Sequence, residues 1–365
     1  MSGSLLAGWF APLAIYIAIL ILHLSLPARR VEGYAVDAVT GRPLTYRLNG
    51  LLVFAVVVGI WLAAGEQGWL SRDWLYATRW SAMGGACLVG LAYSTITVLG
   101  ARPTGRPFLA DLYLGRRENP QHLGKRVDAK MFLYLAGAVM LGLNTLSAAA
   151  FHAIELGEGG NPGVYLHAAL LTFFVLDYLV FERVHLYTYD LFAERVGLKL
   201  GWGCLAFYPF FYPVGLWGTA HLGEPSVIAD LGWIWLSLSA LVFLSGWVLA
   251  RGANLQKYVF KRFPERAFLG RFPPRVIRGG NLTLLVELPD DVDFVHPDSD
   301  ADAVTFSVPD TSEEAALFNA RGFLLSNAQP AYAYIGHPGR DIYRRVAVNA
   351  VGVVAVERWT GSAWE

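Results

Sequence analysis

The sequence predicts an all-α polytopic membrane bundle of about seven transmembrane helices with a small β-rich C-terminal cytoplasmic appendage. The chain has 365 residues, of which 55% are hydrophobic and only 16% charged, whereas a soluble domain has about 25% charged residues. The apolar residues are gathered in blocks, and a helix of roughly 20 apolar residues crosses a bilayer. Lys and Arg follow alternate blocks. Together these observations predict a membrane protein up to about residue 250.

About seven apolar blocks have the length and composition of membrane spans. They lie at residues 5–26, 49–66, 80–100, 131–154, 164–182, 200–218 and 228–250. The first block has no basic segment before it, and Arg29 and Arg30 follow it directly. This pattern predicts a retained span rather than a cleaved signal peptide.

The distribution of Lys and Arg predicts the orientation of these spans. Clusters of cations follow the first, third, fifth and seventh blocks, at residues 29–47, 102–130, 183–199 and 251–278. The intervening connections contain only Arg72 and Arg79 in one case and no Lys or Arg at 155–163 and 219–227. Because cations are enriched on the cytoplasmic side, we expect the N-terminus outside and the C-terminal segment in the cytoplasm.

The character of the chain changes at about residue 280. Short apolar runs at 282–286 and 351–356 are separated by segments with Pro, Gly and Asp, a pattern typical of strands and turns. We therefore expect a transmembrane domain over residues 1–279 and a small soluble β-rich appendage over residues 280–365. The formal net charge of zero gives no indication of nucleic-acid binding.

The segment from Phe108 to Pro120 contains two acids, Asp111 and Glu118, among several arginines. One interpretation is a folded loop that packs under the spans and frames a ligand opening. The other is a solvated loop with surface ion pairs, each of which contributes little to stability. The sequence alone favours the solvated loop.

Two carboxylates accompany the fifth apolar block. Asp177 lies inside the apolar run from Phe173 to Phe181, and Asp190 follows a short distance later. Ionisable groups at membrane depth are unfavourable and usually line a cavity or pair internally. A functional role and a structural role in hydrogen bonding both remain open for these two residues.

The sixth block contains Pro209 and Pro213, which predict a kinked or broken helix. The phenol of Tyr212, between them, could donate a proton if its phenolate were stabilised. The alternative interpretation of this segment is an aromatic packing stripe, and the spacing alone favours it.

A basic run follows the last apolar block. Lys257 and Lys261 are four residues apart, so a helix would place both ammonium groups on one side. Asn254 lies one turn earlier and could add amide hydrogen bonds. The pattern suits a phosphate-bearing ligand, but lysines past a membrane helix also serve to fix topology and meet lipid headgroups. The scattered histidines show no metal-site spacing, and we predict no metal.

Three of these segments together resemble the sterol reductase family, which includes the C14 and C7 sterol reductases, the fungal C24(28) reductase and the lamin B receptor. The resemblance covers about residues 75–285. Its first segment is the family's Asp-x-x-x-Gly-Arg-x-x-Asn-Pro loop, here Asp111, Gly115, Arg116, Asn119 and Pro120, with Asp128 following. Its second is similar to Asp177, Glu182, Thr188, Asp190, Gly197, Gly203, Pro209, Phe210 and Tyr212. Its third is similar to Gly252, Ala253, Asn254, Gln256, Lys257, Phe260 and Lys261.

The resemblance implies NADPH-dependent reduction of a carbon–carbon double bond in a sterol or related polycyclic lipid. It implies that Lys257 and Lys261 contact cofactor phosphate, with Asn254 and Gln256 nearby. It also implies that Tyr212 lies beside the sterol double bond as a candidate proton donor. As our own hypothesis, we expect Asp177 and Asp190 to be supporting catalytic residues. Reduction of an isolated alkene needs an acid at one carbon and a hydride at the other, and a dry pocket favours both steps.

A non-catalytic membrane lipid-binding or scaffold protein derived from the same fold is the alternative. The family continues with further helices and a cofactor-binding signature, and the similarity ends near Leu284–Val286, which favours the alternative. The retained Lys257 segment favours the enzyme. A third possibility is that the sequence after about residue 285 is foreign and carries no information about function.

Overall fold

The structure is a computed structural model that describes residues 2–37, 40–223, 229–263, 266, 269 and 360, together with five short strands between residues 317 and 358. The chain divides into two compact units, Met1–Phe263 and Pro264–Glu365. The predicted boundary between residues 279 and 280 lies outside the described residues.

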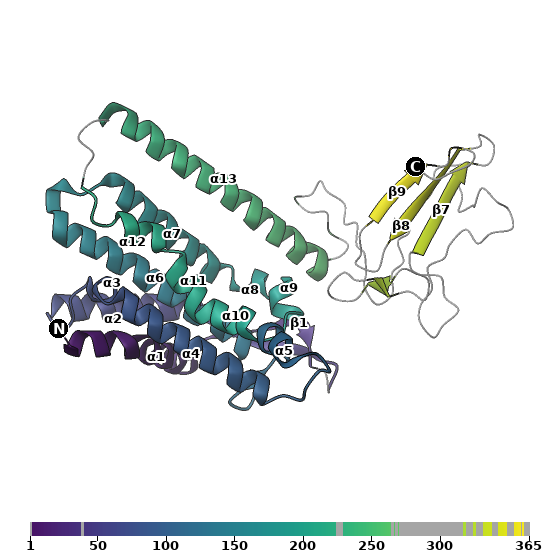
Figure 1. Cartoon of the computed structure of the whole chain (residues 1–365), viewed down its shortest axis with the longest axis horizontal. Coiled ribbons are helices and arrows are strands. Elements are labelled where there is room, and N and C mark those ends of the chain that lie inside the picture. Colours follow the sequence, from purple (N-terminus) through teal and green to yellow (C-terminus); the bar gives the residue numbers. More distant parts are fainter. Residues whose placement is uncertain are drawn as a thin grey trace. The chain divides into compact units, whose positions relative to one another are not determined.

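Five helices of the first unit are long and apolar enough to cross a membrane (Figure 1). They are α1 (Ser2–Ser25), α4 (Arg79–Leu99), α6 (Ala129–Leu156), α7 (Pro162–Val180) and α13 (Ala229–Arg262). A sixth apolar helix, α2 (Gly50–Glu66), has 17 residues. The fold is therefore mostly helical and membrane-spanning, as the sequence predicts. The described residues contain five helices long enough to span a membrane, fewer than the seven predicted.

The sixth predicted span is a series of short helical pieces. These are α10 (Leu198–Trp202), a π-helical turn (Gly203–Phe207), α11 (Tyr208–Phe211) and α12 (Val214–Thr219). Pro209 and Pro213 have no backbone N–H to donate, so the regular helical hydrogen bonds are interrupted here. The predicted break is present, whereas an unbroken span over 200–218 is not.

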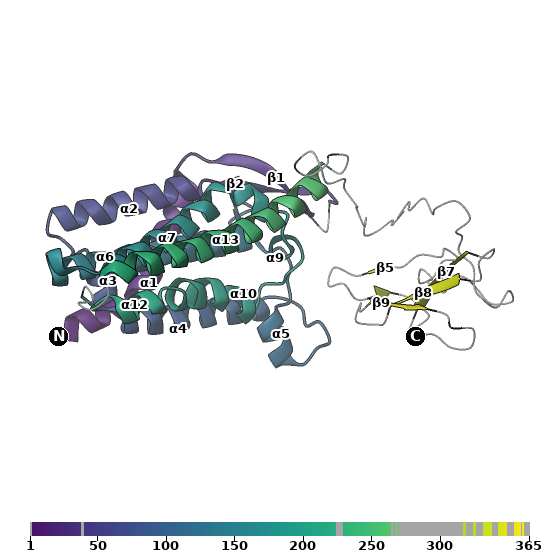
Figure 2. The same ribbon diagram turned by 90° about the horizontal axis from the view of Figure 1, so that it is seen from above.

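Helix α6 is the centre of the first unit, since most of its residues are buried. The Asp128 carboxylate caps it by accepting a hydrogen bond from the Met131 backbone N–H at 2.9 Å. Gly137 lets the π-helical turn approach, because a Cβ there would lie 2.5 Å from the Cys204 carbonyl oxygen. Helix α13 is the outermost long helix and runs beside α7 (Figure 2).

Four further short helices connect the long ones. They are α3 (Trp74–Ala77), α5 (Phe108–Leu114), α8 (Glu182–His185) and α9 (Tyr189–Phe192). Two small antiparallel hairpins accompany them in the first unit, β1 (Arg29–Val36) with β2 (Pro43–Leu48), and β3 (Gln121–His122) with β4 (Val127–Asp128). The β1–β2 hairpin lies beside the last turn of α13, where the Lys261 ammonium is 4.7 Å from the Tyr34 ring centroid.

The loop around α5 is folded against the spans, so the expectation of a solvated loop is wrong for Asp111. The Asp111 side chain is fully buried, and its carboxylate is 2.7 Å from Arg116 Nε and 3.0 Å from Arg106 Nη2. The hydrogen bond from Thr104 and the Arg116 charge outweigh burial and lower the pKa of Asp111 to about 2. Glu118, in contrast, is half-exposed.

The strands of the second unit are all antiparallel where they pair. A two-stranded pair joins β5 (Leu317–Phe318) to β6 (Leu324–Leu325). A three-stranded sheet has the order β7 (Ala331–His337), β8 (Ile342–Val348) and β9 (Val354–Arg358). The extent and role of an appendage over residues 280–365 stay predictions, because much of this segment lies outside the described residues.

Candidate functional site

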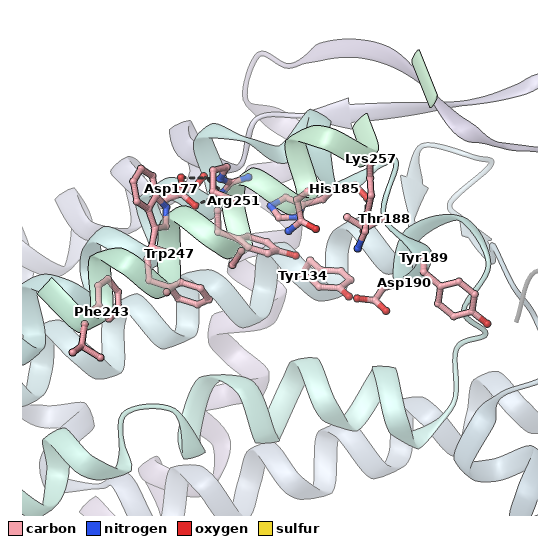
Figure 3. A pocket seen from close by; sticks show the side chains of 16 residues that line it. Tyr134, Asp177, His185, Thr188, Tyr189, Asp190, Phe243, Trp247, Arg251 and Lys257 are labelled. Carbon is pink, nitrogen blue, oxygen red and sulfur yellow. Dashed lines mark hydrogen bonds and ion pairs between the residues drawn. The ribbon is translucent and has the colours of Figure 1, made fainter. Parts of the chain in front are cut away.

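A cavity of about 650 Å³ lies between α6, α7, the α8–α9 segment and α13 (Figure 3). Its lining changes from apolar to polar along α13, from Phe243 and Trp247 through Arg251 to Lys257. The rise of 1.5 Å per residue gives roughly 20 Å between the two ends of this wall. This volume lies within the range of small-molecule sites, which are about 300–1,000 Å³.

A buried ion pair joins α13 to α7 in the cavity wall. Arg251 Nε donates to Asp177 Oδ1 at 3.2 Å, and Arg251 Nη2 also donates to Asp177 Oδ2. Both side chains are less than 10% exposed, and the guanidinium lies 4.3 Å from the Phe181 ring centroid. The pair is neutral as a unit, so it adds no net charge to this depth of the cavity.

Two stacked rings form the next part of the wall. The rings of His185 and Tyr178 have centroids 3.9 Å apart. Burial and the adjacent Arg251 charge lower the pKa of His185 to about 3, against the opposing effect of a hydrogen bond to the Tyr178 backbone. The imidazole is therefore neutral near pH 7.

A phenol and a carboxylate meet near the mouth. The Tyr134 phenol interacts electrostatically with the Asp190 carboxylate, and Figure 3 shows the two groups turned toward each other. The Tyr134 ring also stacks on Tyr178, with centroids 5.7 Å apart. Asp190 is exposed, so this carboxylate lies where the cavity opens.

The structure brings four of the seven predicted site residues to this cavity. Asp177, Asp190, Asn254 and Lys257 line it. Asn254 and Lys257 lie one helical turn apart on α13, and the exposed Lys257 forms part of the rim.

The other three predicted residues, Gln256, Lys261 and Tyr212, lie elsewhere. Gln256 is exposed and does not line the cavity, because two residues along a helix place it on another face from Asn254. The Lys261 ammonium donates to the Tyr187 carbonyl at 2.9 Å and lies 3.6 Å from the Phe192 ring centroid.

Tyr212 is 47% exposed and is not part of the cavity lining. Its ring centroid lies 4.9 Å from that of Tyr208 and 6.3 Å from that of Phe174. Phe174 does line the cavity, so Tyr212 neighbours one residue of the apolar part of the wall.

Four further residues of the cavity lining have no role predicted from the sequence: Tyr134, Tyr178, His185 and Arg251. Arg251 has a signal that could have identified it, because it precedes Asn254 by three residues and so shares a face with it. Nothing in the spacing of Tyr134 predicts that α6 turns this phenol toward Asp190.

A family model described as the ergosterol biosynthesis ERG4/ERG24 family matches residues 7–287. The Delta(14)-sterol reductase of Arabidopsis thaliana is 28% identical over 276 residues, which cover 70% of this chain and 69% of that protein. The Delta(14)-sterol reductase of Methylotuvimicrobium alcaliphilum is 29% identical over 298 residues, 78% of this chain and 64% of that protein. The 7-dehydrocholesterol reductase of Xenopus laevis is 28% identical over 229 residues, 60% of this chain and 47% of that protein. The matched part of the chain thus spans between about half and about two thirds of these relatives.

Proposed function

Because this chain belongs to the ergosterol biosynthesis ERG4/ERG24 family, we propose that it reduces a carbon–carbon double bond in a sterol or related polycyclic lipid. The relatives named above as sterol reductases support this reaction class. The observation that carries the proposal is the cavity between α7 and α13, whose apolar wall ends in a polar mouth. Such a cavity suits an amphiphilic lipid with an apolar body and a second, polar reactant at the mouth.

NADPH is the reductant that we propose, and the described residues fit it in part. Lys257 and Asn254 lie together on the cavity rim, where an ammonium and an amide can bind phosphate oxygens. Lys261 would have to leave the Tyr187 carbonyl to take part. When bound, NADPH would supply the hydride for the second alkene carbon.

The remaining steps belong to side chains of this chain. A phenol must deliver a proton to one alkene carbon before or as the hydride arrives at the other. Tyr212 is the proposed donor from the family resemblance, and its ring centroid lies 6.3 Å from that of Phe174 in the apolar wall. Asp177 acts through Arg251, which fixes α13 against α7. Asp190 acts through Tyr134, whose phenol it orients at the mouth.

The direct test is turnover by the purified full chain in detergent. We expect a sterol with a Δ14 double bond to gain two hydrogens, measured by mass spectrometry, with matching loss of NADPH absorbance. Lys257→Gln should raise the KM for NADPH by about tenfold or more, since a charge-assisted hydrogen bond contributes roughly 1.5–3 kcal/mol.

Lys125→Gln is the matched control, because Lys125 is an exposed lysine paired with Asp37 away from the cavity lining. Its KM for NADPH should not change. Sterol binding by the wild-type chain without any reduction would instead support the non-catalytic lipid-binding protein, which the family relatives do not favour. A chain that binds neither sterol nor NADPH would overturn the proposal.

A further inference from the structure

A surface groove of about 460 Å³ lies between α4, α5 and the segment formed by α10 and the π-helical turn. Leu88 and Leu91 of α4 form one wall, and Trp202 and Phe207 form the other. Leu88, Leu91 and Phe207 are about half-exposed, and exposed apolar side chains gathered on one surface indicate contact with a membrane or a partner. Because α4 is long and apolar enough to cross a membrane, this part of the groove faces lipid.

Two polar side chains lie at one end of the groove. Tyr113 of α5 and Lys199 of α10 both line it, and α5 packs beside α10 and the end of α4 (Figure 2). Helix α4 ends at Leu99, which places the polar end where this span meets water. From Lys199 to Phe207 the apolar wall extends for roughly 12 Å. The groove is therefore amphipathic along its length.

The polar end lies beside an excess of positive charge. The segment over residues 100–117 contains four arginines and one acid, Asp111, which is paired with two of them. Lys199 is 48% exposed and uses one of its three N–H donors on Glu194 Oε2 at 2.8 Å. This hydrogen bond raises the pKa of Lys199, so the ammonium is charged near pH 7 and has two donors left. Glu194 balances the charge of Lys199, and the arginines supply the excess that attracts an anion.

We propose that the groove binds one anionic phospholipid, with an acyl chain along Trp202 and Phe207 and its phosphate at Lys199 and Tyr113. Phosphate oxygens accept hydrogen bonds from an ammonium and a phenol, and cationic pockets between membrane helices bind anionic headgroups. A sterol could fill the apolar part of the groove, but it has no charge for the polar end. The linings of the groove and of the cavity have no described residue in common, so this proposal does not rest on the proposed function.

Gly203 allows the groove to be filled by mutation. It lines the groove, and no heavy atom lies within 4 Å of the position of an added Cβ, so a side chain there extends into open space. Gly203→Leu should therefore displace the acyl chain without a clash in the protein. Gly59→Leu is the matched control, because Gly59 on α2 also has no heavy atom within 4 Å of an added Cβ and is not part of the groove lining.

The test measures the affinity of the purified full chain for phosphatidylglycerol and for phosphatidylcholine with the same acyl chains, by native mass spectrometry from detergent. We expect the wild type to prefer phosphatidylglycerol by on the order of tenfold, because several cations lie near the anionic headgroup. Gly203→Leu should lower the affinity for both lipids by about tenfold, whereas Gly59→Leu should bind them as the wild type does.

A second pair of variants tests the headgroup contact. Lys199→Gln should reduce the preference for phosphatidylglycerol by about fivefold, since it removes one cation at the polar end. Lys125→Gln is its control, because Lys125 is an exposed lysine that is also paired with an acid, Asp37, and does not line the groove. Its preference should equal that of the wild type.

Equal binding of the two lipids by the wild type would overturn the proposal, as would wild-type affinity in Gly203→Leu. Lys199 is at the surface, so Lys199→Gln decides the question if Gly203→Leu does not fold, and an unchanged preference in Lys199→Gln would overturn the headgroup site. Displacement of the phospholipid by an uncharged sterol would assign the groove to sterol and also overturn the proposal. None of these outcomes changes the sterol turnover that tests the proposed function.

Discussion

The Arg251 guanidinium on α13 and the Asp177 carboxylate on α7 form a buried ion pair at the wall of the cavity. Arg251 Nη2 adds a contact of 3.4 Å to the Asp177 backbone carbonyl. The Asp177 carboxylate therefore holds α13 in position through Arg251. This contact supports a positioning role for Asp177 rather than a role in proton transfer. Because α13 also carries Asn254 and Lys257, this pair sets the geometry of the cavity mouth.

Removal of one partner of this pair should strongly destabilise the protein. Asp177→Asn leaves the Arg251 charge buried without compensation, which costs about 3–5 kcal/mol in comparable buried pairs. The double variant Asp177→Leu with Arg251→Met should lose less stability than either single variant. Chemical denaturation in detergent measures both, and a single variant as stable as the wild type would contradict the role of the pair.

Glu182 should make stability depend on pH. Burial raises the pKa of Glu182 to about 7, against the opposing effect of the Gly50 backbone N–H that it accepts at 3.1 Å. The folded pKa lies above the unfolded one, so the contribution is fully present below about pH 4.5 and is lost as the pH rises through about 7. Glu182→Gln should therefore be more stable than the wild type above pH 7 and lose this pH dependence. Glu118→Gln, a change at a half-exposed site, should leave the dependence in place.

Gly115 should tolerate no side chain. Its φ is +87°, and a Cβ would lie 2.5 Å from the Val196 carbonyl carbon. Gly115→Ala should push the α5 loop away from the segment before α10. Gly124→Ala is the control, because its φ of +66° is also left-handed but no heavy atom lies within 4 Å of its Cβ. The thermal midpoint should fall more for Gly115→Ala, and an equal loss in both variants would show that strain alone matters.

Two phenols compete for the role of proton donor. If Tyr212 donates the proton, Tyr212→Phe should lower kcat by about 10²–10⁴ while sterol affinity is retained. Tyr134→Phe should then have a smaller effect. The opposite result, with turnover lost only in Tyr134→Phe, would transfer the role to the Tyr134 phenol, which lies near Asp190 in the cavity lining.

The helices were predictable from the sequence where apolar runs are long. The block predicted over 131–154 is α6, and the block over 164–182 is α7, because a run of apolar residues bounded by polar ones specifies a spanning helix by length alone. The region around Pro209 was predictable only as a break. The π-helical turn in this region packs against α4 and α6. The hydrogen bonds that replace the regular helical ones depend on these tertiary contacts, which the residue spacing cannot predict.

The site was predictable only where motif residues share a helix face. Asn254 and Lys257 both line the cavity, as their spacing of three residues on a helix predicts. The same helical periodicity places Gln256 on another face, so its exclusion from the site was also predictable. Lys261 has the right spacing, but it lies past the cavity, where the Tyr187 carbonyl binds it. Tyr178 and His185 could not be assigned, because their stacking depends on the turn between α7 and α8. The orientation of the termini across the membrane stays a prediction.

The most direct test of the central claim is photo-crosslinking of the full chain in membranes with a diazirine-bearing sterol. The account predicts adducts on α13 between Phe243 and Arg251 and on α7 near Phe174, lost on competition with the unlabelled sterol. Adducts confined to the separate surface groove beside Trp202 and Phe207, with none on α13, would contradict it.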